Sequence, residues 1–100
     1  MSQPLIEAKE TVEKIAKHIE QDALMAQLKN VNRLVEQNQN KIWLRTKSGK
    51  PIAEKLQTTA AETLEKLGSG SEEIASLITE LEDIAKEIDE ESARRSMIVT

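Results

Sequence analysis

The segment around the single aromatic residue has the composition of an anion-binding loop. Residues 41–50 carry four cations and no acid, and the only tryptophan lies among them. A basic loop with an aromatic side chain is suited to binding phosphates or an acidic protein surface. The structural alternative is a helix C-terminus with favourable cations, with the aromatic ring covering the end of the core or the loop docking on acids of the same chain. The candidate anion-binding residues are Lys41, Trp43, Arg45, Lys47 and Lys50.

Nucleotide, phosphotransfer and metal chemistry have little support. Gly49-Lys50 is followed by proline, whereas a phosphate loop needs Ser or Thr there and a strand before it. His18 is the only histidine, and it lacks the small neighbours that we expect around a phosphotransfer histidine, so we expect it to face solvent. One histidine and no cysteine also argue against transition-metal sites. We therefore expect no cofactor and no metal.

Carboxylates at i, i+3 spacing are the remaining candidates for catalysis. They are Glu7, Glu10 and Glu13, then Glu80 with Asp83, and Glu87 with Glu90. Such pairs bind Mg²⁺ in all-α nucleotide hydrolases when two helices point them into a cleft. Because the composition of surface helices also produces this spacing, we expect a solvated face and no enzymatic activity. A magnesium-dependent hydrolase is the alternative.

The composition predicts that helices position all of these residues. The 100 residues include three Gly and two Pro, but ten each of Ala, Leu and Ile, which indicates an all-α fold in one domain. The absence of cysteine excludes a disulfide framework. No apolar run approaches the ~20 residues of a membrane span, and residues 1–20 lack the apolar stretch of a signal peptide. We therefore expect a cytoplasmic protein.

Two groups of breaker residues divide the chain into three helical segments. They lie around Gly49-Lys50-Pro51 and Gly68-Ser69-Gly70, and apolar residues recur between them at intervals of three and four. The predicted elements are a helix at about 4–44, a basic loop at 45–50, a helix at about 51–67, a Gly/Ser loop at 68–71, an acidic helix at about 72–94 and a short tail at 95–100.

The apolar stripe of the first segment changes phase, because the step from Ile19 to Leu24 is five residues. Asp22 is able to cap a new helix there, which would produce a four-helix bundle. No Gly or Pro supports a break, so we favour one continuous helix. The expected fold is a small helical bundle or antiparallel helical hairpin with one long N-terminal helix and two shorter helices. It closes within one chain or leaves an open stripe for a second chain.

These stripes favour a non-enzymatic protein–protein interaction module: a scaffold, adaptor or small chaperone that binds by helix packing. A second copy of the chain, as in a homodimer, is one candidate partner. A stripe asparagine can fix register and oligomeric state. The predicted contact residues, which suit an ordinary core equally well, are Leu28, Val31, Val35, Asn38, Ile42, Ile74, Leu81, Ile84 and Ile88.

The net charge of −4 conceals a gradient along the chain. Residues 1–50 carry nine cations against six acids, and residues 71–100 carry three cations against nine acids. The basic and acidic regions should attract each other within one chain or between chains. The acidic total disfavours nucleic acid as a partner, and nucleic acid or another anionic surface at the basic loop is the alternative to protein binding.

Overall fold

The computed structural model describes the backbone of residues 3–98, and all of their side chains except those of residue 71 and residues 96–98. The elements are α1 (Gln3–Ala16), α2 (Asp22–Asn38), the short 3₁₀ turn η1 (Ile42–Arg45), α3 (Lys50–Glu65) and α4 (Ser71–Ile98). No strand occurs between residues 3 and 98, so the all-α prediction is confirmed. Within this range, no helix combines the length and apolarity that crossing a membrane requires.

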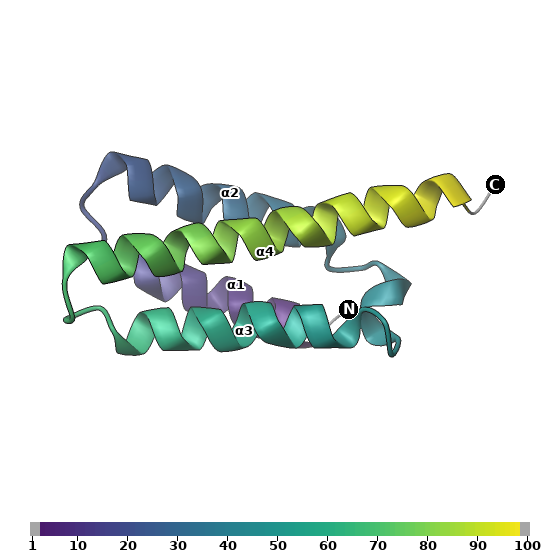
Figure 1. Ribbon diagram of the computed structural model, residues 1–100, viewed down its shortest axis with the longest axis horizontal. Helices are drawn as coiled ribbons and strands as arrows, with labels where there is room; N and C mark the ends of the chain where they lie inside the picture. Colours follow the sequence, from purple (N-terminus) through teal and green to yellow (C-terminus); the bar gives the residue numbers. More distant parts are fainter. Residues whose placement is uncertain (1–2, 99–100) are drawn as a thin grey trace.

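The four helices form an elongated bundle with extents of 46 × 21 × 17 Å. Each helix runs antiparallel to the one before it, so that α1–α2 and α3–α4 are two hairpins lying side by side (Figure 1). The most extensive packing joins α1 to α3 and α2 to α4. Since every helix reverses direction, these closely packed pairs run parallel. The η1 turn therefore leads the chain across the end of the bundle, from α2 to the diagonally placed α3.

The N-terminal segment consists of two helices, so the prediction of one long helix at 4–44 is wrong. α1 ends at Ala16 and α2 begins at Asp22, where the apolar stripe changes phase. One continuous helix would carry the two halves of the stripe to different sides, whereas a turn lets both halves face the core. The turn begins where the backbone N–H of His18 donates to the carbonyl of Ile15 at 2.9 Å.

The other boundaries also differ from the prediction in places. The predicted helix at 51–67 is α3, and residues 42–45 form the separate η1 turn instead of a helix end. α4 has 28 residues and is the longest helix, so the longest helix lies at the C-terminus and not at the N-terminus. It continues through most of the predicted tail at 95–100, where residues 99–100 lie outside the described residues. Two acids in its first turn and Arg95 in its last turn suit the helix dipole.

The core is aliphatic, and small residues on α3 allow its close approach to α1. Ala53 and Ala60 are fully buried there, facing a helix whose own stripe includes the buried Ala8. Thr63 is also fully buried, and its hydroxyl donates to the carbonyl of Thr59 at 2.8 Å, so no unpaired donor results. The large side chains that are 0–1% exposed include Leu5, Ile15, Leu28, Leu44, Leu56, Ile78, Leu81 and Ile88.

Candidate partner-binding surface

Eight of the nine predicted contact residues pack inside this chain's own bundle. Each is at most 4% exposed, and together they are Leu28, Val31, Val35, Asn38, Ile74, Leu81, Ile84 and Ile88. Their neighbours are the other helices of the same chain, so the apolar stripes close within one molecule. The ninth residue, Ile42, is 72% exposed. A partner that meets the closed bundle would therefore touch Ile42 and not the other eight.

Asn38, the asparagine in the apolar stripe of α2, also forms its contacts within this chain. The Nδ2 of Asn38 donates to the carbonyl of Leu34 at 2.8 Å and to a carboxylate oxygen of Asp89 at 3.0 Å. Asn38 is only 2% exposed, so these bonds satisfy an amide that would be costly to bury unpaired. The pair links the end of α2 to α4 and helps to set their register.

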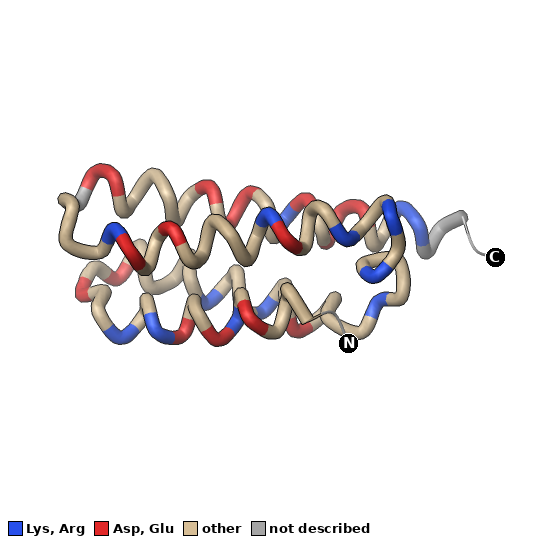
Figure 2. The backbone as a smooth tube through the Cα atoms, turned by 90° about the horizontal axis from the view of Figure 1, so that it is seen from below, with Lys and Arg blue, Asp and Glu red and all other residues tan. Residues whose placement is uncertain are grey.

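The four predicted cations lie in or next to η1 in the chain, and Figure 2 shows Lys and Arg positions gathered at that end of the bundle. Lys41, Arg45, Lys47 and Lys50 are all exposed, and none of them forms an ion pair with a described acid. The exposed Ile42 lies between the first two in the chain. We call these four cations together with Ile42 the basic end.

Trp43 attaches the basic end to the bundle. Its indole Nε1 donates to the hydroxyl of Ser92 at 2.8 Å, and the guanidinium of Arg95 lies 4.6 Å from the centre of its ring. Arg95 also donates to the hydroxyl of Ser48 at 3.2 Å, and its Nε lies 3.5 Å from a carboxylate oxygen of Glu91. The basic loop therefore docks on α4 through Trp43 and Ser48, and not through ion pairs with the acids of that helix.

Gly49 allows the loop to fold tightly under η1. A Cβ at this buried position would collide with the carbonyl oxygen of Trp43 and would lie 2.5 Å from Cε3 of its ring. The hydroxyl of Thr46 donates to the same carbonyl at 2.6 Å, and its backbone N–H does so at 3.1 Å. These contacts hold the turn in one conformation. Sequence reasoning missed this role, although a glycine between Ser48 and Lys50, six residues after the only tryptophan, was a usable signal.

A second charged surface runs along the outer side of α4. It consists of Glu80, Asp83, Glu87 and Glu90, which recur at intervals of three and four and are all exposed. None of them forms an ion pair with a described residue. We call these four carboxylates the acidic face. Its four side chains are exposed while Leu81, Ile84 and Ile88 of the same helix are buried against the core, so the acidic face points to solvent.

The carboxylates do not assemble into a metal centre in the described part of the chain. The α1 acids Glu7, Glu10 and Glu13 are exposed, as are those of the acidic face. Between residues 3 and 98, no three His, Asp or Glu side chains described by the structure lie close enough to hold one ion. The spacing noted in the sequence thus places these residues on solvated surfaces.

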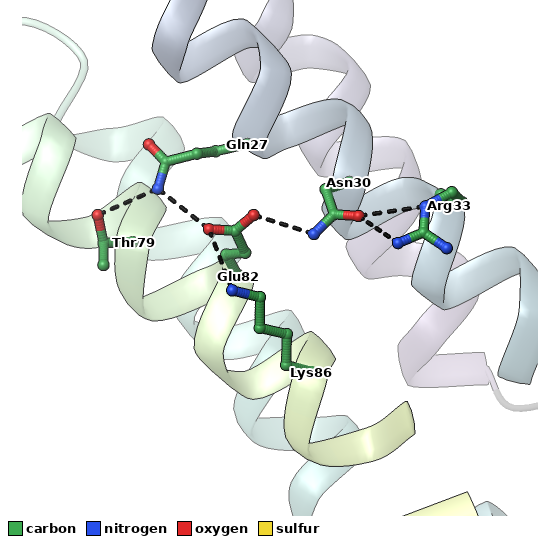
Figure 3. A network of polar contacts seen from close by, with 6 residues as sticks. All are labelled: Gln27, Asn30, Arg33, Thr79, Glu82 and Lys86. Carbon is green, nitrogen blue, oxygen red and sulfur yellow. Dashed lines mark hydrogen bonds and ion pairs between the residues drawn. The ribbon is translucent and has the colours of Figure 1, made fainter. Parts of the chain in front are cut away.

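A polar network that sequence reasoning missed joins α2 to α4 (Figure 3). Glu82 accepts hydrogen bonds from Asn30 at 2.9 Å and from Gln27 at 3.2 Å, and Lys86 lies 3.9 Å away. Burial raises the pKa of the Glu82 carboxyl group, but the two donors and the lysine together outweigh burial, so the pKa is lowered. The amide-rich composition of α2 was the available signal.

The opposite end of the bundle has a hollow of about 410 Å³ between the α1–α2 and α3–α4 loops. Apolar side chains such as Leu24, Leu67 and Ile74 line it, together with His18 and Glu20. His18 is exposed there and has no hydrogen bond from its side chain to another described residue. The hollow gathers no cluster of charges comparable with the basic end.

No family model, curated protein or solved structure matches this chain.

Proposed function

We propose that the protein is a non-enzymatic interaction module that binds an acidic protein segment at its basic end. The observation that carries this proposal is the exposure of Ile42 among four unpaired cations. Ile42 is 72% exposed, and no other large hydrophobic side chain described by the structure is exposed. An apolar centre with a charged rim is the usual anatomy of a protein-binding patch.

The rigidity of the turn supports binding. Trp43 fastens η1 to α4 through its bond to Ser92, while the bonds of Thr46 to the Trp43 carbonyl and the close approach of Gly49 tighten the turn itself, so little backbone freedom remains to be lost on association. Preorganisation of this kind raises affinity because it lowers the entropic cost of binding. The long, flexible cation side chains then supply charge complementarity and a fast association rate.

A protein partner is favoured over nucleic acid by the surroundings of Trp43. Binding of single strands relies on aromatic rings that stack on bases. Here Arg95 lies over the ring and Ser92 accepts the indole N–H, so the aromatic side chain is already engaged within the chain. Nucleic acid remains the alternative that the experiment below distinguishes.

The proposal is tested by the fluorescence anisotropy of two labelled ligands at low salt. One is a synthetic peptide that alternates glutamates with leucines, and the other is a single-stranded oligonucleotide of equal charge. We expect the peptide to bind more tightly than the oligonucleotide, with an affinity that falls as salt rises. Tighter binding of the oligonucleotide, or no binding of the peptide, would overturn the proposal.

Variants locate the binding surface. Replacement of Lys41, Arg45, Lys47 and Lys50 by Gln should abolish peptide binding, and Ile42→Ser should weaken it with the charges intact. The matched control replaces the exposed Lys14, Lys17, Lys29 and Lys55 by Gln. This control changes the net charge equally but leaves the basic end untouched, so its affinity should stay within a factor of two to three of wild type. Equal losses in both quadruple variants would show that net charge, and not this surface, drives binding.

A further inference from the structure

We propose that the basic end binds the acidic face of α4 on a second copy of the chain, so that copies associate end to side. This inference rests on the proposed function, because it uses the same basic end and names its acidic partner. It goes further in assigning the partner surface by its residues: Glu80, Asp83, Glu87 and Glu90.

The two surfaces complement each other in charge. The basic end presents four cations and the acidic face presents four carboxylates, and all eight side chains are exposed. No ion pair within the described residues uses any of the eight. Other charged side chains of α4 do form ion pairs within the chain: Glu91, next to Glu90, pairs with Arg94 at 3.3 Å. The eight unpaired charges thus stay available for a contact between molecules.

The two surfaces also agree in size. The carboxylates from Glu80 to Glu90 cover about 15 Å of helix, given a rise of 1.5 Å per residue. The two shorter extents of the molecule are 21 and 17 Å, so a surface across the bundle has dimensions similar to this stretch of helix. Within one molecule the basic end lies where η1 crosses the bundle, and α4 runs on past it (Figure 1), whereas the acidic face lies along the outer side of α4. A second copy can therefore bring them together where a single copy does not.

Such a contact joins two different surfaces, so a pair keeps one free acidic face, on the copy whose basic end is bound, and one free basic end, on the other copy. Heterologous contacts of this kind build open filaments of many copies, unless the rotation between successive copies closes the assembly into a ring. We expect association that rises with protein concentration. It should be weakened tenfold or more in about 1 M salt, where the Debye length falls to about 3 Å.

The test uses two neutralised variants and sedimentation velocity at low salt. The end variant replaces Lys41, Arg45, Lys47 and Lys50 by Gln, and the face variant is E80Q/D83N/E87Q/E90Q. Wild type should sediment as species above 11.2 kDa. Each variant alone should be monomeric, because it lacks one of the two surfaces. An equimolar mixture should form a 1:1 complex and nothing larger, because only one complementary pair of surfaces remains.

A control variant with other carboxylates neutralised shows whether self-association depends on the acidic face, and peptide binding is measured separately. Replacement of the exposed Glu10, Glu13, Glu54 and Glu65 by Gln should leave self-association unchanged, and helicity by circular dichroism should match wild type for every variant. A wild type that stays monomeric, or a mixture that stays monomeric, would overturn the second-copy partner. If the glutamate–leucine peptide still binds the basic end in that case, the proposed function stands without it. If neither the peptide nor a second copy binds, both fail.

Discussion

The indole Nε1 of Trp43 donates a hydrogen bond of 2.8 Å to the hydroxyl of Ser92, which lies 49 residues further along the chain. This bond joins the η1 turn to α4 and holds the basic end on the bundle. Ser92 is 5% exposed, so its hydroxyl is available to the indole and hardly at all to water. The surface proposed to bind a partner is therefore supported by a buried contact rather than by the cations themselves.

Removing the acceptor should loosen the basic end. Ser92→Ala leaves the indole N–H without its partner, and we expect a loss of about 1 kcal/mol in the free energy of unfolding. For a chain of this length that loss lowers Tm by about 4–8 °C. Calorimetry measures the shift, and tryptophan fluorescence reports the change around Trp43. Ser76→Ala, at an exposed position of the same helix, is the control, and an equal shift there would contradict the assignment.

Gly49 should tolerate no side chain. In Gly49→Ala the new Cβ meets the carbonyl oxygen and the ring of Trp43, so η1 has to move. We expect a loss of about 1–3 kcal/mol, which is typical of overpacking. Urea unfolding measures it. Gly68→Ala is the matched control because a Cβ added there would meet no neighbouring side chain or backbone within 4 Å. A Gly49 variant as stable as the Gly68 variant would refute the role.

Glu82 should make stability depend on pH. Burial raises its pKa, but Asn30, Gln27 and Lys86 together hold the pKa below its ordinary value of 4.5. A carboxyl group whose pKa is lowered by folding stabilises the native state above its unfolded-state pKa. This stabilisation is lost as the pH falls through the folded-state value. We expect Glu82→Gln to be less stable than wild type at neutral pH and to approach wild type below pH 4.5.

Urea unfolding between about pH 7 and about pH 3 checks this dependence on protonation. Asn30→Ala should shift stability in the same direction by a smaller amount, since it removes one of the two amide donors. Asn40→Ala, at an exposed position outside the network, is the control. If the difference in the free energy of unfolding between wild type and Glu82→Gln stayed constant over this pH range, stability would not depend on the protonation of Glu82, and the prediction would be wrong.

Truncation to alanine should affect stability very differently at two residues that were predicted from the same apolar stripe, Leu28 and Ile42. Leu28 is 1% exposed, so Leu28→Ala should cost about 2–5 kcal/mol of stability. Ile42 is 72% exposed, so Ile42→Ala should change stability by no more than about 0.5 kcal/mol. Peptide affinity should instead fall in the Ile42 variant. Chemical denaturation and anisotropy together separate the two roles, and a large stability loss at Ile42 would place it in the core.

Magnesium should leave the protein unchanged. A hydrolase with paired carboxylates would be stabilised by the ion that it binds. The candidate pairs lie on exposed surfaces of α1 and α4, so we expect Tm to stay constant as Mg²⁺ rises through the millimolar range. Calcium at equal ionic strength is the control for general screening. A rise in Tm specific to magnesium would revive the enzymatic alternative.

Local sequence patterns were enough to establish that the chain is helical and which side of each helix is buried. Intervals of three and four place residues such as Val31 and Leu81 on one side of a helix, whatever that side packs against. The positive charge of the basic loop was also visible, because no acid occurs between Lys41 and Lys50. These properties depend on neighbours within one or two helical turns.

The break between Ala16 and Asp22 and the exposure of Ile42 depend instead on tertiary packing. No local breaker marks the first turn. It forms because two stripes that differ in phase can both be buried only if the chain reverses. Ile42 follows Asn38 at the spacing of the stripe, yet α2 ends at Asn38 and η1 turns Ile42 to the surface. That turn is held by Ser92 and Arg95 from α4, and contacts between residues so far apart in the chain arise only from packing.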